Sequence, residues 1–247
     1  MQEPTYLILG ATGGVGRLLC QRLSKRGANL ALAARDPERL QSLAAETGGL
    51  PLAVDARHSH EVDGAVAQAV ERFGGLDGAV NLVGSILLKP AHLTRPGEWE
   101  DLLATNLGSA FHLVRSAAPA LRGRGGSIVL VSTAAARVGL PNHDAIAAAK
   151  AGVEGLTRSA AATYAGSDIR VNCVAPGLLE TPLSERLLRS EASRATSEAM
   201  HPLGRIGRPE DVASAIAWLL DAENAWVTGQ VLGVDGGLSS VRGRPRG

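Results

Sequence analysis

The residues whose spacing suggests chemistry most clearly are glycines near the N-terminus, in the stretch GATGGVG at 10–16. A short apolar run precedes it and a helical pattern follows, which is the setting in which glycine-rich loops bind phosphate. Gly10 would allow the tight turn, Gly14 would let the backbone approach a pyrophosphate, and Gly16 would let the helix pack closely on the strand. The helix N-terminus then offers free N–H groups to the phosphate. We predict a dinucleotide-binding loop made by Gly10, Thr12, Gly14, Val15 and Gly16; the alternative is a purely structural turn.

The end of the next predicted strand decides which dinucleotide would fit. A carboxylate there would hydrogen-bond a ribose 2′-hydroxyl and repel a 2′-phosphate. The sequence instead has the small Ala34 followed by Arg35, whose planar fork of donors suits phosphate. Asp36 is better interpreted as the N-cap of the following helix, and Arg17 would add positive charge. We therefore predict NADP(H) in preference to NAD(H), with a solvated surface arginine at position 35 as the alternative.

Strands and helices must alternate along the whole chain to hold these residues. Continuous apolar runs predict strands at 6–9, 30–34, 52–54, 79–83, 127–132, 170–174 and 231–234. Helical spacing predicts helices at 15–26, 37–46, 60–73, 96–122, 142–164 and 209–220. Buried strands separated by helices indicate a parallel sheet covered on both faces. The predicted fold is α/β, a single doubly wound Rossmann domain with about seven strands.

Two segments depart from this alternation. Residues 182–202 are polar, charged and mildly helical, and they follow the carboxyl end of a strand, where such sheets bind ligands; they are a candidate lid. Residues 1–240 are expected to form the domain, and residues 241–247 a flexible basic tail. The tail resembles a hook that enters the DNA minor groove, but a solvated tail is the favoured interpretation.

Composition limits the function further. With 45% apolar and 20% charged residues, the chain is typical of a soluble globular protein. The net charge of +1 gives no bulk attraction to nucleic acid or membranes, and we expect neither as a partner. Cys20 and Cys173 fit a reducing compartment, and the N-terminus does not resemble a signal peptide, so we expect a cytoplasmic protein. His92 and His112 lack further ligands at metal-binding spacing, and we expect no metal site.

Beyond the glycine loop, several motifs occur in an order that closely resembles the short-chain dehydrogenase/reductase family, over about residues 5–238. The nearest group resembles the bacterial ketoacyl-carrier-protein reductases. The resemblance implies that Asp55 contacts adenine and that 170–177, with Thr181, form the nicotinamide loop. Residues 81–84 (NLVG) are similar to the family's Asn-Asn-Ala-Gly, with the second and third residues changed. The further typical runs are 202–211 and 233–237. The cofactor-binding residues implied in this way are Asp55, Asn81, Gly84, Lys150, Pro176, Gly177 and Thr181.

The same resemblance locates the catalytic residues and one departure from the family. The family uses a tyrosine and a lysine four residues apart on one helix, with a serine that orients the substrate carbonyl and an asparagine that supports a water chain. Here Lys150, Thr133 and Asn106 hold three of these positions, but the tyrosine position is Ile146. Isoleucine cannot donate a proton, and loss of a general acid costs roughly 10²–10⁴ in rate. Lys150, alone or through water, and His143 are the candidate substitutes; the alternative for His143 is an exposed residue at the start of the helix.

Two functions follow, and they differ in class. The first is an oxidoreductase that transfers hydride between NADP(H) and a small carbonyl or alcohol substrate through an atypical site. The second is a catalytically silent dinucleotide-binding member, acting as a sensor or as the partner of an active relative in a mixed oligomer. Helices 96–122 and 142–164 are apolar on more than one face, and in the family they form a dimer interface. We therefore expect a homo-oligomer, either a dimer or a tetramer.

Overall fold

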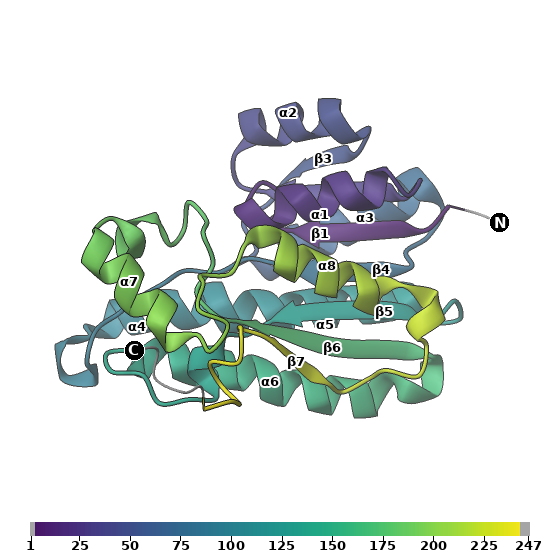
Figure 1. The fold of residues 1–247 in the computed structure, drawn as a ribbon. Coiled ribbons are helices and arrows are strands. Elements are labelled where there is room, and N and C mark those ends of the chain that lie inside the picture. Colours follow the sequence, from purple (N-terminus) through teal and green to yellow (C-terminus); the bar gives the residue numbers. More distant parts are fainter. Residues whose placement is uncertain (1–2, 243–247) are drawn as a thin grey trace.

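In the computed structural model, which describes residues 3–242, seven parallel strands form one sheet in the order β3-β2-β1-β4-β5-β6-β7 (Figure 1). The chain crosses over after β3, so β1 and β4 lie side by side at the centre, which is the switch point of a doubly wound sheet. The strands are β1 (Thr5–Leu9), β2 (Asn29–Ala34), β3 (Leu50–Ala53), β4 (Gly78–Asn81), β5 (Gly126–Val131), β6 (Ile169–Pro176) and β7 (Val231–Val234). The predicted fold class is confirmed.

Helices cover both faces of the sheet, and each face has its own apolar core because successive strand side chains point to opposite sides. Leu7 and Leu9 of β1 pack under one group of helices, whereas Ile8 packs under the other. The first group comprises α3 (Ser59–Phe73), α5 (Ser109–Leu121) and α6 (Asp144–Tyr164). The second comprises α1 (Gly14–Ser24), α2 (Pro37–Thr47) and α8 (Pro209–Leu220).

The predicted single helix at 96–122 is wrong in one respect, because the chain changes its helical pitch halfway. Residues Pro96–Leu103 form α4, a π-helical turn occupies Ala104–Gly108, and α5 follows. Asn106 sits in this turn, is fully buried, and donates from Nδ2 to the Leu102 carbonyl at 3.1 Å. Such turns insert one residue into an α-helix and are frequent at functional sites. The turn aims the Asn106 side chain at the segment that follows β4.

Strand β4 ends at Asn81 and not at the predicted residue 83. The Asn81 carboxamide explains this end, because its Oδ1 accepts from the Val83 amide at 3.0 Å and so turns the backbone out of the sheet. Strand β6 is longer than predicted and runs to Pro176. These differences of two residues decide which side chains reach the end of the sheet.

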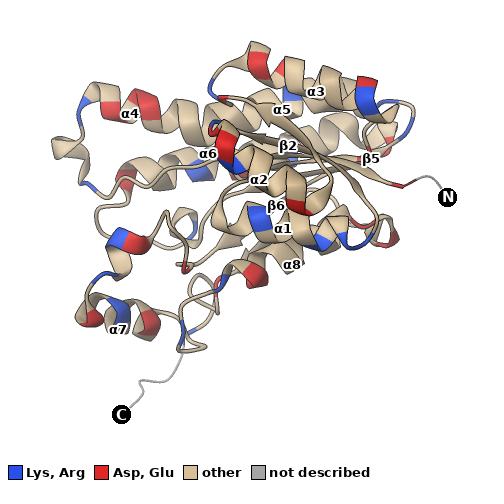
Figure 2. Cartoon of the chain, turned by 90° about the horizontal axis from the view of Figure 1, so that it is seen from above, with Lys and Arg blue, Asp and Glu red and all other residues tan. Residues whose placement is uncertain are grey.

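The candidate lid at 182–202 contains a short 3-10 turn (Glu185–Leu188) and α7 (Glu191–Met200). Ser190 caps α7 by accepting from the Ser193 amide at 3.1 Å. Figure 1 shows α7 beyond one end of the strands, on the same side as α4. Basic and acidic residues are scattered over the helices, and α7 carries both (Figure 2). Of the predicted tail, residues 243–247 lie outside the described residues.

Within residues 3–242, no helix combines the length and the apolar character that crossing a membrane requires.

Candidate functional site

The glycine loop is packed so tightly that side chains are excluded from two of its positions. Gly10 has a φ of +79°, and its amide donates to the Ala33 carbonyl at 2.8 Å. A Cβ on Gly16 would lie 2.3 Å from the carbonyl oxygen of Gly10, closer than any real contact allows. Gly13, the N-cap of α1, has no side chain with which to bind the first amides of the helix. The loop therefore leaves backbone N–H groups of α1 available to an anion.

The loop that follows β6 reaches across to the glycine loop. A Cβ on Gly14 would lie 3.1 Å from Cγ2 of Thr181, so these predicted cofactor residues, 167 positions apart in sequence, face one another. The Ser184 hydroxyl holds Thr181 in place by accepting from its amide at 3.1 Å. Gly177 donates to the Val234 carbonyl at 3.2 Å, and Pro176 is the last residue of β6. Thr12 and Val15 are half-buried in the glycine loop itself.

At the end of β2, Arg35 is exposed and Ala34 is buried. Asp36 is the N-cap of α2, as predicted, and accepts from the amides of Glu38 and Arg39, each at 3.1 Å. The expectation that Arg17 adds free positive charge is not supported, because its guanidinium pairs with the Glu46 carboxylate.

Arg39 was missed by sequence reasoning, although its guanidinium reaches the glycine loop. Its Nη2 donates to the Thr12 carbonyl at 3.3 Å across 27 residues of sequence. The signal available in the sequence was its position one helical turn after Arg35, on the first turn of a capped helix.

Asp55 and Asn81 lie at the ends of β3 and β4 and have different surroundings. Arg57 donates from Nε to both carboxylate oxygens of Asp55, each at 3.0 Å, and these hydrogen bonds lower the pKa of Asp55 to about 2. Asp55 is thus a charged, partly exposed acceptor. Asn81 is buried, and it donates from Nδ2 to the Ser109 hydroxyl at 2.9 Å. The carboxamide oxygen of Asn81 thus shapes the turn after β4, and its nitrogen anchors that turn to Ser109 at the start of α5.

Lys150, Asn106 and Gly84 come together beside that turn. A Cβ on Gly84 would lie 3.1 Å from Oδ1 of Asn106, which is a tight contact, and 3.6 Å from Nζ of Lys150, which is an ordinary one. The Lys150 ammonium donates to the Val131 carbonyl at 2.8 Å. Burial lowers the pKa of Lys150 to about 8. Asn106 accepts from the Ser85 amide at 3.2 Å, which ties the π-helical turn to the segment after Gly84.

Thr133, and not its neighbour Ser132, offers a hydroxyl at this end of the sheet. Ser132 is buried. Its hydroxyl donates to the Lys150 carbonyl and to the Glu154 carboxylate, each at 3.1 Å. Thr133 is half-buried, and its Oγ1 lies 3.5 Å from the Pro176 carbonyl, a long contact that leaves the hydroxyl easily redirected. Thr133, which follows β5, thus lies beside Pro176, where the loop that carries Gly177 and Thr181 begins.

Ile146 faces an apolar cluster on the same helix as Lys150. The side chain is 6% exposed and is buried among Leu102, Ala145 and Ala149, with Leu87, Leu88 and Leu103 packed against the cluster. His143 stands at the N-cap of α6, where its Nδ1 donates to the Pro141 carbonyl at 2.8 Å.

His201 is a second residue that sequence reasoning missed. It follows α7, is buried, and accepts at Nε2 from the Leu178 amide at 3.2 Å while Nδ1 donates to the Ser197 carbonyl at 2.7 Å. A Cβ on Gly177 would lie 2.5 Å from His201 Nε2. His201 thus fastens the candidate lid to the loop at 176–181, a contact without any signal in local spacing.

Across the part of the chain that the structure describes, no three His, Cys, Asp or Glu side chains gather where they could hold a metal ion.

Comparison with known proteins adds a family to this geometry. Residues 10–239 match the family model described as "Enoyl-(Acyl carrier protein) reductase". The 3-oxoacyl-[acyl-carrier-protein] reductase FabG of Thermotoga maritima is 38% identical over 246 residues, which cover 96% of this chain and 98% of the relative. FabG of Vibrio cholerae is 32% identical over 98% of this chain and 99% of its own length.

Solved structures agree with the sequence relatives. A short-chain type dehydrogenase/reductase from Mycobacterium ulcerans superposes with a TM-score of 0.91 at 30% identity, covering 98% of this chain and 92% of that one. A variant of actinorhodin polyketide ketoreductase with NADPH superposes with a TM-score of 0.92 at 29% identity, covering 98% and 100%. With the strand order, the glycine loop and the lysine on α6, these matches show that the chain belongs to the short-chain dehydrogenase/reductase family of oxidoreductases.

Proposed function

We propose that this protein transfers hydride between NADP(H) and a small carbonyl or alcohol substrate, with Lys150 in place of the missing phenol as the proton source. The observation that carries the proposal is the buried Lys150 ammonium, 2.8 Å from the Val131 carbonyl and beside Gly84 and Asn106. A lysine is costly to bury, and its position beside Asn106 at the end of the sheet favours use over packing.

The residues present fit a dinucleotide phosphate. Gly10, Gly14 and Gly16 would hold its pyrophosphate against the free amides of α1, and Arg35 would meet the 2′-phosphate at the end of β2. Asp55 would accept from the adenine amino group, and the 176–181 loop, with Pro176, Gly177 and Thr181, would border the nicotinamide. When bound, NADPH supplies the hydride. The similar actinorhodin ketoreductase was solved with NADPH, which supports this choice of coenzyme.

The substrate side of the proposal concerns three groups. The Thr133 hydroxyl would hydrogen-bond the carbonyl oxygen, and Lys150 would give it a proton directly or through water held near Asn106. At a pKa of about 8 the ammonium is mostly charged at pH 7, so the proton is present and more acidic than that of an exposed lysine. His143 is the weaker candidate donor, because its Nδ1 proton is engaged by Pro141.

A specific observation favours the second candidate function, that of a silent family member. The position of the phenol is filled by Ile146 inside an apolar cluster that includes Leu87 and Leu88 from the segment after β4. Such packing stabilises the site without contributing a proton donor. A protein of this kind would bind the coenzyme as a sensor, or would complete an oligomer with an active relative.

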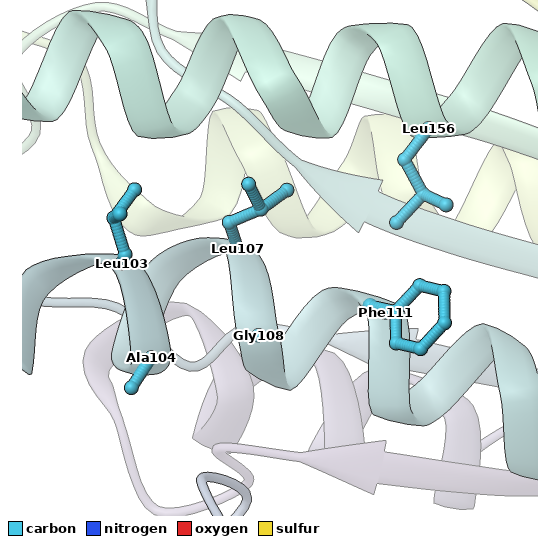
Figure 3. A pocket seen from close by; sticks show the side chains of 6 residues that line it. All are labelled: Leu103, Ala104, Leu107, Gly108, Phe111 and Leu156. Atoms are coloured by element: carbon cyan, nitrogen blue, oxygen red, sulfur yellow. The ribbon is translucent and has the colours of Figure 1, made fainter. Parts of the chain in front are cut away.

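We further propose a homo-oligomer, a dimer or a tetramer, in the cytoplasm. An apolar pocket lies between the segment 103–111 and Leu156 of α6, and Figure 3 shows the residues that line it. Phe111, one of these residues, is 53% exposed. The pocket is lined by Leu103, Ala104, Leu107, Gly108, Phe111 and Leu156. At the edge of the sheet, Leu232 of β7 is 38% exposed and Trp226 is fully exposed. A second copy would cover such patches. Cys20 and Cys173, both free and buried, support the placement in a reducing compartment.

The test compares wild type with Ile146→Tyr and, as a matched control for bulk, Ile146→Phe. NADPH consumption is measured over a panel of ketones and ketoacyl thioesters. We expect slow wild-type turnover, a gain of roughly 10²–10⁴ for Ile146→Tyr, and none for Ile146→Phe. Wild-type rates equal to the uncatalysed reaction, with an active Ile146→Tyr, would establish the silent member instead. Absence of NADPH binding by the folded wild type would contradict both functions.

A further inference from the structure

We propose that Arg39 is a second specificity residue, which pairs with the 2′-phosphate of NADP(H) in addition to Arg35. The inference rests on the proposed NADP(H) function, and it adds a residue that would strengthen the preference for NADP(H) over NAD(H).

The start of α2 places Arg39 beside the glycine loop. Asp36 accepts from the amides of Glu38 and Arg39, which fixes the first turn of α2 directly after Arg35. From that turn the Arg39 guanidinium crosses to the loop, where Nη2 lies 3.3 Å from the Thr12 carbonyl. Arg39 therefore reaches the loop at 10–16, while Arg35, exposed like Arg39, directly follows β2.

Charge distinguishes Arg39 from the other arginine near the loop. Arg17 is neutralised by Glu46, whose second oxygen also accepts from Gln21 at 3.0 Å. No carboxylate among residues 3–242 lies within ion-pair distance of Arg39, and a carbonyl takes up only one of its five donors. Asp36 is the N-cap of the helix that carries Arg39, and its Oδ1 accepts from two backbone amides. Arg39 is therefore an exposed cation with spare donors beside a phosphate-binding loop.

The chemistry of the ligand matches this pair. A phosphate monoester carries close to two negative charges and three acceptor oxygens, more than one guanidinium engages in a bidentate pair. Two arginines would engage it together. NADH has a hydroxyl at this position, so the contribution of Arg39 would be confined to the phosphorylated coenzyme.

The experiment measures the dissociation constants of NADPH and NADH by fluorescence titration for Arg39→Gln, Arg39→Lys and Arg17→Gln. We expect Arg39→Gln to weaken NADPH about 10- to 100-fold and leave NADH unchanged. Arg39→Lys should recover part of the loss, because it keeps the charge without the fork. Arg17→Gln is the matched control, an arginine near the loop already paired with an acid, and should change neither constant.

Two different failures can be told apart. If wild type prefers NADPH but Arg39→Gln weakens it no more than Arg17→Gln does, Arg39 has no such role and the coenzyme assignment stands. Equal loss of NADPH and NADH would show that Arg39 only supports the loop through Thr12. If wild type binds the two coenzymes equally, the NADP(H) assignment and the role of Arg39 both fail. A competition series with 2′,5′-ADP against 5′-AMP should show the same selectivity and locate the effect at the 2′-phosphate.

Discussion

The glycine loop is held by contacts between backbone atoms, whereas the surroundings of Ile146 are held by contacts between side chains. Gly10 and Gly16 have no space for a Cβ, and their contacts are with backbone atoms that cannot rotate away. Ile146, by contrast, is held among leucine and alanine side chains, which repack at modest cost when a neighbour changes. Under the proposed function, coenzyme binding would be fixed by the path of the chain, while the proton donor would depend on one exchangeable side chain. Binding and turnover should therefore respond separately to substitution.

The largest expected effect is on turnover, at Lys150. Lys150→Met keeps the length of the side chain but removes the ammonium that Val131 accepts from. We expect the rate of carbonyl reduction to fall by roughly 10²–10⁴, and by more than the affinity for NADPH, because a proton donor acts in the transition state. Steady-state kinetics and a fluorescence titration on the same preparation separate the two quantities. Equal losses in both would reduce Lys150 to a coenzyme contact.

The pH profile of wild type checks the same assignment without a substitution. A donor with a pKa of about 8 is protonated below that pH and loses its proton above it. Reduction should therefore be constant from pH 6 to about 7 and fall about tenfold per pH unit above 8. Oxidation of the alcohol needs the neutral amine and should rise over the same range. A reduction rate that stays flat through pH 9 would exclude Lys150 as the donor.

The next largest effect is expected in the glycine loop, at Gly16, on stability and on NADPH binding. Gly16→Ala places a methyl group 2.3 Å from one carbonyl oxygen and 2.7 Å from another, so the loop must open. We expect a loss of about 3 kcal/mol in stability and of NADPH binding together, since overpacking usually costs 1–3 kcal/mol and here no side chain can yield.

Gly64→Ala is the control for this substitution, because Gly64 lies within α3 with no atom within 4 Å of its would-be Cβ. It should stabilise the protein by about 0.5–1 kcal/mol. Thermal unfolding with and without NADPH measures both variants. A Gly16→Ala protein as stable as wild type would mean that the loop is made by adaptable contacts after all.

The smallest expected effect concerns the lid. His201→Ala leaves the Leu178 amide without its acceptor and the Ser197 carbonyl of α7 without its donor, which should loosen the 176–181 loop. We expect NADPH to bind roughly 5- to 30-fold more weakly, the equivalent of one or two lost hydrogen bonds. Met200→Ala, an exposed neighbour on α7, should leave the affinity unchanged. If both variants bind like wild type, the lid contributes nothing to the coenzyme half of the site.

The sequence was informative where the structure depends on local patterns. Apolar runs located the seven strands, the Asp36 cap started α2 where predicted, and the glycine spacing identified the loop. Four-residue spacing on one helix placed Lys150 and Ile146 on the same side. All of these are properties of a few consecutive residues.

What could not be predicted arises from contacts between distant segments. In the π-helical turn, Asn106 accepts from the amide of Ser85, 21 residues earlier. The residues of the turn give no sequence signal for this change of helical pitch. Arg39 meets Thr12, and His201 meets Leu178, only because the sheet brings separate loops to one end. The burial of Ile146 by Leu87 and Leu88 likewise depends on the path after β4.

The contact of Thr181 with Gly14 has a kinetic consequence. Since the two loops touch across the place where a pyrophosphate would pass, we expect exchange of one coenzyme molecule for another to require the 176–184 segment to swing aside. That movement breaks the Leu178–His201 hydrogen bond, so residence time, and not only affinity, should depend on how firmly α7 is anchored. Release of the oxidised coenzyme would then be the rate-limiting step of steady-state turnover whenever the chemical step is fast.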